Sequence, residues 1–328
     1  MTTALGIHHV TGIAGDAQQN VDFYAGVLGL RLVKKTVNFD DPNTYHLYYG
    51  DETGSPGSLL TFFPWPRSRK GRVGVGEVAV TSLAIAPRSI GFWLERFVTK
   101  GVEHSALARR FGESVIAFKD RDGLQLELVA TESAERRGAW TGGTVAAEHA
   151  IHGVYSVTLW EHSLDDTEHA LVDGLGFRRV ATEDATTRFA IGDGGASKIV
   201  DVRVVGGFLA PLGGAGTIHH VAFRAATDAA ELELRETVVG LGMDATPVID
   251  REYFHSVYYR EPGGVLFEIA TDVPGFAIDE PVEALGTSLK LPPQYEPRRA
   301  ELERGLPPLH APFLPPLHGE HQDRTVTS

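Results

Sequence analysis

The chain has 328 residues, of which 42% are hydrophobic and 22% are charged, and its formal net charge is −13. This composition is typical of a folded globular protein with room for two domains, and an acidic chain without a stripe of Lys and Arg argues against nucleic acid or an anionic membrane as partner. The absence of cysteine excludes disulfides, thiolate nucleophiles and Cys-ligated metal centres. We see neither a signal peptide nor an apolar run of about 18 residues, so we expect a cytoplasmic protein without a transmembrane helix.

Residues 5–63 predict one βαβββ unit. A strand over 5–14 precedes an amphipathic helix over 16–28, with Asp16 as the N-cap and Gly29 as the stop. Three β-rich stretches follow and are separated by turn-like segments: 31–39, 44–49 and 58–63.

The same unit recurs three more times. Modules 2, 3 and 4 cover residues 77–130, 151–205 and 217–271, and their helices are expected near 89–99, 164–174 and 228–239. A lone module cannot bury both faces of a small sheet, so the modules should pair. We therefore predict an α+β protein in which four βαβββ modules form two eight-stranded half-barrels.

The sequence also predicts how the modules follow one another. Modules 1 and 2 fill residues 1–130, and modules 3 and 4 fill residues 151–271. Residues 131–150 contain few large apolar side chains and are the expected linker. Residues 272–328 leave the repeat pattern and carry Leu-Pro-Pro motifs, which predict a proline-rich C-terminal extension with one short helix near 298–304.

Modules 1 and 4 begin with the same phrase, Ile-His-His-Val, which places His9 and His220 at matching positions. Glu268 lies on the last strand of module 4, where module 1 has Thr61. Two histidines and one carboxylate are the ligand set of a non-haem Fe(II) oxygenase with open coordination positions. A single buried His is more often a hydrogen-bonded core residue, but matched positions in a repeat favour a metal site.

Equivalent positions indicate which modules share this metal. The position of His9 and His220 holds Gly153 in module 3, and module 2 has no His on its first strand. Pairing modules 1 and 4 gives the complete set of His9, His220 and Glu268, whereas pairing 1 with 2, or 3 with 4, gives two ligands. We therefore predict that modules 1 and 4 share the metal site.

Two residues keep alternatives open. A pairing of modules 3 and 4 that uses His152 as a ligand is not excluded. Glu127, on the last strand of module 2, is either a remnant of duplication or a hydrogen-bonded structural residue.

Side-chain alternation along a strand limits the role of each histidine pair. Adjacent residues point to opposite faces, so only one His of each pair can reach the metal. His8 and His219 would then lie behind the sheet or at its edge, as hydrogen-bond partners of the ligands. Thr11 shares the face of His9.

These residues resemble the vicinal oxygen chelate superfamily, which includes glyoxalase I, extradiol dioxygenases and bleomycin-binding proteins. The general motifs span residues 6–11 and 23–30. More specific motifs are similar to the branch of ring-cleaving dioxygenases that open hydroquinones, and they lie at 34–42, 44–50, 64–66, 289–293 and 296–299.

The resemblance implies Fe(II) held by His9, His220 and Glu268, with an aromatic diol and O2 as substrates, while a homo-oligomer is left open. Arg251 would stabilise negative charge, and Tyr258 would donate a hydrogen bond or relay a proton, as would the two outer histidines. The catalytic residues that the resemblance implies around the metal are His8, Thr11, His219, Arg251 and Tyr258.

Two other functions fit the same fold. A glyoxalase-type isomerase generally uses zinc or nickel with a fourth protein ligand, and Thr61 stands at that fourth position here. A non-catalytic binding protein of this fold generally lacks the metal triad, so the three ligands argue against it.

Overall fold

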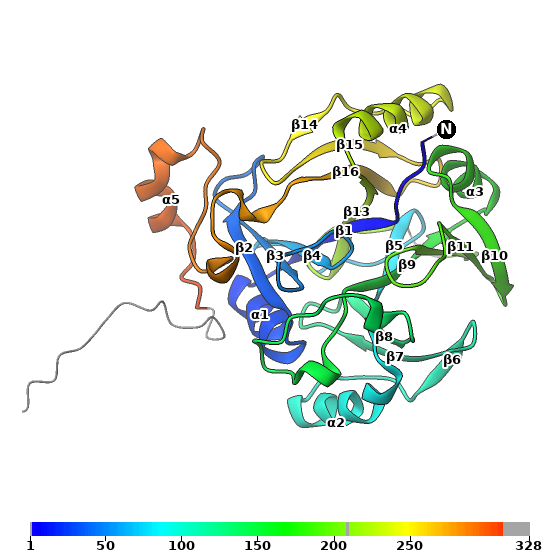
Figure 1. The fold of residues 1–328 in the computed structure, drawn as a ribbon, viewed down its shortest axis with the longest axis horizontal. Helices are drawn as coiled ribbons and strands as arrows, with labels where there is room; N and C mark the ends of the chain where they lie inside the picture. The colour runs from blue at the N-terminus through cyan, green and yellow to red at the C-terminus, as the bar shows by residue number, and fades with distance from the viewer. Residues whose placement is uncertain (1, 208–209, 311–328) are drawn as a thin grey trace, which may run out of the picture.

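Two curled eight-stranded sheets make up the computed structural model, which describes residues 2–207 and 210–310 (Figure 1). In the described residues, no helix is long and apolar enough to cross a membrane.

Each module contributes four strands and one principal helix, as the repeat predicted. Module 1 contains β1 (Ile7–Ala14), α1 (Ala17–Val21) with a π-helical continuation (Asp22–Val27), β2 (Arg31–Val37), β3 (Tyr45–Gly50) and β4 (Leu59–Pro64). Module 2 contains β5 (Glu77–Ile85), α2 (Ile90–Lys100), β6 (Ala108–Arg110), β7 (Glu113–Lys119) and β8 (Gln125–Ala130). Module 3 contains β9 (Val154–Glu161), α3 (Asp165–His169) with a π-helical continuation (Ala170–Gly174), β10 (Arg178–Glu183), β11 (Thr186–Ala190) and β12 (Ile199–Val204). Module 4 contains β13 (Thr217–Ala225), α4 (Asp228–Gly240), β14 (Ile249–Asp250), β15 (Phe254–Arg260) and β16 (Leu266–Pro274).

The remaining helices are short. The C-terminal helix α5 spans Arg299–Gly305. Single 3-10 turns lie at Pro87–Ser89, Ala134–Arg136, Ala147–His149, Phe276–Ile278, Val282–Ala284 and Glu296–Arg298.

Local signals at the first helix agree with the sequence. The side chain of Asp16 accepts a hydrogen bond from the backbone N–H of Gln19, as an N-cap does. Gly29 has φ +73°, a left-handed conformation that ends the helix at little cost for glycine.

The strand order confirms the predicted pairing of modules 1 and 4. The first sheet has the order β14-β15-β16-β13-β1-β4-β3-β2, and the second has the order β10-β11-β12-β9-β5-β8-β7-β6. The alternative pairing of modules 3 and 4 is wrong, because β13 pairs with β1 and not with β9. His152 lies outside the strands, and its Nδ1 is 2.9 Å from the backbone oxygen of Arg137.

Each sheet therefore draws one module from each half of the chain. Residues 131–150 run from β8 to β9 and bury Ala134, Val145 and Ala150. The division of the chain into residues 1–130 and 151–271 describes the order of the modules along the sequence and remains a prediction.

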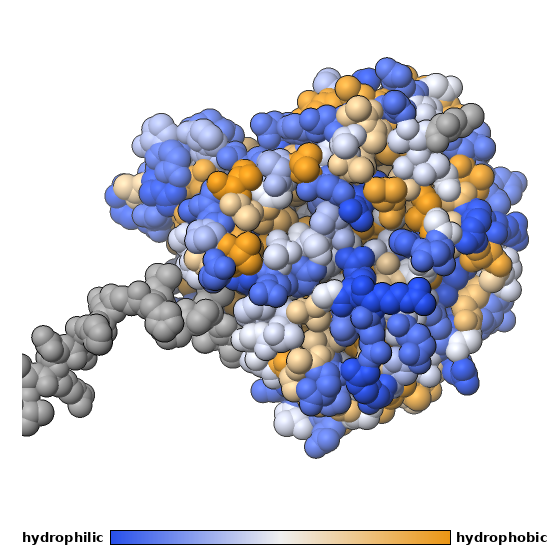
Figure 2. Space-filling view, viewed as in Figure 1, coloured by the Kyte–Doolittle hydropathy of each residue, from blue (hydrophilic) through white to orange (hydrophobic). Residues whose placement is uncertain are grey.

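The main apolar core lies between the sheets and the helices. Val10 and Val221, at the centre of the β1–β13 pair, belong to one hydrophobic cluster together with residues of both sheets. Helix α4 covers the outer side of β15 and β16 (Figure 1). Figure 2 shows hydrophobic residues on the viewed face in separate groups among hydrophilic ones, which is usual for a protein surface.

The described part of the C-terminal extension packs on module 1. Lys34 on β2 is fully buried, and its Nζ lies 2.5 Å from Asp279 and 2.6 Å from Glu280. Glu280 also accepts a hydrogen bond from Ser288. The rest of the predicted extension, residues 311–328, lies outside the described residues.

Replacing Lys34 with Ala should lower the free energy of unfolding by about 3–5 kcal/mol, because Glu280 then keeps a buried charge without its counter-ion. Chemical denaturation measures the change. Lys100→Ala, at the exposed end of α2, is the control and should be near neutral. An equal, small effect of both substitutions would contradict the buried ion pair.

A second buried charge lies between modules 3 and 4. Glu161 at the end of β9 and Glu261 after β15 are each 1% exposed. Glu261 accepts hydrogen bonds from Thr167 and from backbone N–H groups, whereas Oε1 of Glu161 has no partner among the described residues. Burial, together with the charge of Glu261, raises the pKa of Glu161 to about 8.

This raised pKa predicts a pH dependence of stability. The folded chain keeps the Glu161 proton up to about pH 8, and the unfolded chain loses it near the usual value of 4.5. The free energy of unfolding should therefore fall as pH rises between these values, by roughly 1.4 kcal/mol per pH unit from this group. Glu161→Gln should flatten the slope in urea denaturation between pH 5.5 and 8, and exposed Glu132→Gln should not. Parallel profiles for Glu161→Gln and the unaltered protein would contradict the shift.

Candidate metal centre

Both histidine pairs lie at β-bulges in the antiparallel pair β1–β13. The register skips His8 on β1 and His219 on β13, so each is the extra residue of a bulge. The two bulges lie symmetrically about the central pair Val10–Val221. A bulge interrupts the alternation of side chains, and our expectation that neighbouring histidines point to opposite faces is therefore wrong.

Three buried side chains from the two modules meet at one point. His9 Nε2 lies 3.2 Å from His220 Nε2 and 3.3 Å from Glu268 Oε2, and His220 Nε2 lies 2.8 Å from the same oxygen. Metal–ligand bonds of about 2.1 Å at right angles place neighbouring donors about 3 Å apart. The three donors thus fit one face of an octahedral ion.

The charges around these atoms fit a cation. Oε1 of Glu268 accepts a hydrogen bond from Ser256 Oγ at 2.5 Å, whereas Oε2 faces the two ring nitrogens, His220 Nε2 at 2.8 Å and His9 Nε2 at 3.3 Å. Although burial opposes its charge, the imidazoles of His9 and His220 lower the pKa of Glu268 well below its usual value. Burial lowers the pKa of His220, which favours the neutral imidazole that binds metals.

The outer histidines fix how the inner ones are protonated. Nδ1 of His9 lies 2.9 Å from Nδ1 of His8, and Nδ1 of His220 lies 2.7 Å from Nδ1 of His219. A metal on Nε2 leaves the proton on Nδ1, so the inner rings donate and the outer rings accept. Burial, with the neighbouring His9, lowers the pKa of His8 to about 3, which keeps it neutral as an acceptor requires.

A cavity of about 550 Å³ opens in front of the inner histidines. His9, His220 and His219 line it, as do Arg251 and Tyr258. The remaining wall is largely aromatic: Phe39, Phe63, Trp65 and Phe254. The structure thus brings three of the five predicted catalytic residues to one cavity with His9 and His220.

Arg251 lies at the rim of this cavity with two partners. Its guanidinium carbon is 5.3 Å from the ring centre of Tyr258, and its Nη1 is 3.2 Å from Asp40 Oδ2. Asp40 comes from the loop after β2, so Arg251 joins modules 1 and 4 across the cavity mouth.

The other two predicted residues are not among those that line the cavity. His8 is buried behind His9. Thr11 is fully buried, and its Oγ1 lies 2.8 Å from Oγ1 of Thr61.

His46 and Tyr48 of module 1 also line the cavity, and sequence reasoning did not identify them as site residues. His46 Nε2 lies 2.9 Å from Thr61 Oγ1, and its Nδ1 lies 2.8 Å from the hydroxyl of Tyr48. Tyr48 pairs with Thr61 as Tyr258 pairs with Glu268, so the repeat contained the signal that identifies Tyr48 as the counterpart of Tyr258.

The strand registers define which position in each module is equivalent to a candidate metal ligand. Thr61 pairs with Thr11, two residues after His9, and Glu268 pairs with Ala222, two residues after His220. The last strand and the first strand are parallel in each case, so the same rule can be applied to the second sheet.

In the first sheet the histidine lies two residues before the partner of the last-strand residue. In the second sheet Glu127 pairs with Ser82, and Asp201 pairs with Thr158. The positions equivalent to the histidines are therefore those of Val80 and Ser156. Our assignment of Gly153 to this position is therefore wrong. Gly153 precedes β9 and lies three residues before Ser156, so the register expected from the sequence was three residues too early.

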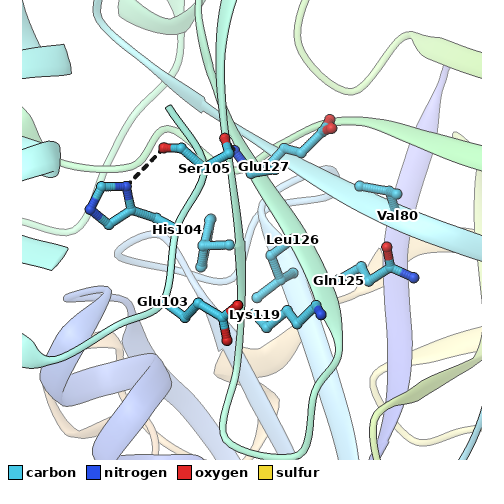
Figure 3. Close-up of a pocket in the computed structure, with 10 residues that line it drawn as sticks. Val80, Glu103, His104, Ser105, Lys119, Gln125, Leu126 and Glu127 are labelled. Carbon is cyan, nitrogen blue, oxygen red and sulfur yellow. Dashed lines mark hydrogen bonds between the residues drawn. The ribbon is translucent and has the colours of Figure 1, made fainter. Parts of the chain in front are cut away.

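Arginines neutralise the two carboxylates of the second sheet. Arg110 makes a two-pronged ion pair with Glu127, which also accepts a hydrogen bond from Ser82. Arg188 pairs with Asp201 in the same way, at 2.8 and 2.9 Å. Figure 3 shows Glu127 with Val80 at a smaller pocket of about 270 Å³, where the histidine of the lining, His104, has its Nδ1 2.9 Å from the backbone oxygen of Ser105. Glu127 is thus a hydrogen-bonded, ion-paired residue.

Known proteins are similar to this chain over nearly its whole length. Residues 6–128 match the model of the Glyoxalase/Bleomycin resistance protein/Dioxygenase superfamily. MhqO of Bacillus subtilis, provisionally named a ring-cleaving dioxygenase, is 46% identical over 93% of this chain and 96% of its own length. The chain belongs to this superfamily. The chlorohydroquinone/hydroquinone 1,2-dioxygenase of Sphingobium indicum is 33% identical over 91% of this chain and 95% of its own length.

Solved structures agree with this membership of the superfamily. A crystal structure of a provisionally assigned dioxygenase from Bacillus subtilis has a TM-score of 0.91 and 44% identity, and covers 95% of this chain and 99% of that one. Glyoxalase I from Zea mays has a TM-score of 0.59 and 15% identity, over 81% of this chain and 92% of that one, and shares the fold alone.

Replacing His9, His220 or Glu268 with Ala should each lower the bound metal by one equivalent per chain, because two remaining donors hold an ion weakly. Elemental analysis after anaerobic loading with Fe(II) and desalting measures this, and far-UV circular dichroism checks the fold. Exposed His162→Ala is the control. Full metal content in His9→Ala would show that module 1 provides no ligand.

Proposed function

We propose that this protein is an Fe(II)-dependent ring-cleaving dioxygenase that opens a hydroquinone-type or related dihydroxy aromatic with O2. The observation that carries the proposal is the buried triangle of His9, His220 and Glu268, whose donor atoms lie within 3.3 Å of one another beside an aromatic-lined cavity. Relatives named as a ring-cleaving and as a chlorohydroquinone/hydroquinone dioxygenase support this class of substrate.

The fourth position of the site supports oxygen chemistry over isomerisation. Thr61 occupies the place in module 1 that Glu268 occupies in module 4. Its hydroxyl is already within hydrogen-bond distance of Thr11 and His46. Three protein ligands on one face leave the opposite face open, which is the arrangement of oxygenases that use this ligand set.

Fe(II) held by these three side chains would supply adjacent open positions at which a phenolate and O2 are brought together, and would lower the pKa of the bound hydroxyl. Both atoms of O2 enter the ring-opened product, so the reaction consumes no external reductant.

The surrounding residues have separate tasks in this proposal. The aromatic walls hold the ring by stacking and exclude water. The Arg251 guanidinium stabilises the negative charge of the substrate oxygen, and Tyr258 beneath it donates a hydrogen bond. His219 faces the cavity, and because its Nδ1 accepts from His220, its Nε2–H is free to donate a hydrogen bond to the substrate. His8 and Thr11, which do not line the cavity, act by orienting His9 and Thr61.

Oxygen uptake tests the proposed reaction. After anaerobic loading with Fe(II), the protein should consume one O2 per molecule of a substituted hydroquinone and yield a ring-opened carboxylate, whereas Zn(II)-loaded protein should consume none. A panel of hydroquinones and catechols in an oxygen electrode identifies the ring pattern. Zinc- or nickel-dependent isomerase activity without oxygen uptake would support the glyoxalase-type alternative instead.

Replacing Arg251 with Ala should leave the iron content unchanged and lower kcat by roughly a hundredfold or more, because the developing negative charge loses its counter-charge. Steady-state oxygen uptake measures the effect. Arg121→Ala, an exposed arginine, is the matched control. Unchanged turnover in Arg251→Ala would remove this residue from the mechanism.

A further inference from the structure

A second group of potential ligands lies on module 4, outside the cavity. Asp228 and Glu231 are one turn apart at the start of α4, and His255 reaches them from β15. One ligand atom from each residue lies within 4.8 Å of the others, and Nδ1 of His255 is 2.8 Å from Oδ1 of Asp228. Cis donors on one metal ion are about 3 Å apart, so small side-chain rotations would bring the three into range.

Glu231 is the residue that points to a ligand. Its side chain is 0% exposed, and neither carboxylate oxygen has a hydrogen-bond partner among the described residues. It does not cap the helix, because Thr227 accepts the hydrogen bond from the backbone N–H of Ala230. A buried carboxylate without donors is unfavourable unless it is protonated or meets a cation. Burial raises the pKa of Glu231 to about 7, although the neighbouring His255 lowers it.

The group is open to solvent on one side. Asp228 is exposed and His255 is partly exposed, so an ion can enter past them and reach the oxygens of Glu231 beneath. The positive end of the α4 dipole opposes a cation here, but two carboxylates in the first helical turns outweigh that partial charge. One imidazole nitrogen and two carboxylate oxygens are a ligand set for divalent transition metals.

We propose that Asp228, Glu231 and His255 form a second divalent-metal site, which holds an ion of the Zn²⁺ class between α4 and β15. The site is separate from the first one. His255 and Ser256 are neighbours on β15, but their side chains contact different partners. Ser256 donates to Glu268 on the inner side of the sheet, and His255 contacts α4 on the outer side. A metal there fastens α4 to the strand that supports Glu268.

Zinc binding in a chain with an impaired first site tests this proposal. In a His220→Ala background, direct titration with Zn²⁺ and elemental analysis should find one equivalent bound per chain. Adding Glu231→Gln should weaken that binding at least tenfold, and adding Glu236→Gln, an exposed glutamate of the same helix, should leave it unchanged. Zinc should also raise the thermal midpoint of His220→Ala, but not that of the chain that also carries Glu231→Gln.

Two results would overturn the proposal: His220→Ala binds no zinc, or the chain with both His220→Ala and Glu231→Gln binds it as tightly as His220→Ala alone. If Glu231→Gln disturbs the fold, His255→Ala replaces it, since His255 is partly exposed and its removal leaves the core intact. Retained zinc affinity in that variant would also reject the site.

Discussion

The antiparallel pairing of β1 with β13 is the contact on which the candidate centre depends. It joins the first and last modules of the repeat and brings together two histidines that are 211 residues apart. The same pairing creates two bulges, and each places one imidazole against the next. One strand register therefore determines both where His9 and His220 lie and which ring nitrogen of each faces the outer histidine. The remaining candidate ligand, Glu268, is held by the neighbouring parallel pair β13–β16.

The two sheets neutralise equivalent buried carboxylates in different ways. In the first sheet one oxygen of Glu268 faces two imidazole nitrogens, whereas in the second sheet guanidinium groups cover Glu127 and Asp201. A bidentate arginine satisfies both oxygens of a carboxylate and leaves no open position. A metal satisfies the charge but keeps positions for other ligands, and that difference separates a candidate reaction site from a structural one.

Much of the fold followed from the repeat, because hydrophobic periodicity and turn residues are local signals. The pairing of modules 1 and 4 was predicted by counting candidate ligands, because only these two modules together provide two histidines and a carboxylate at equivalent positions. The sequence did not predict the orientation of His8, or that Ser156 occupies the position equivalent to His220. A β-bulge and a strand register depend on the partner strand, which local sequence signals do not reveal. His46 and Tyr48 were missed for a similar reason: they approach the site through Thr61, a contact between strands. The proline-rich composition predicted an extended C-terminal segment, but not the buried ions that attach it to Lys34.

The nested strand order has a consequence for synthesis of the chain. The second sheet uses only residues 77–204 and can close as soon as they have left the ribosome. Module 1 is made earlier but must wait for residues 217–225, with one edge of β1 unpaired in the meantime. The second sheet, made of modules 2 and 3, is thus complete while the first sheet still has an open edge. Modules 2 and 3 can then serve as the folded support on which modules 1 and 4 pair.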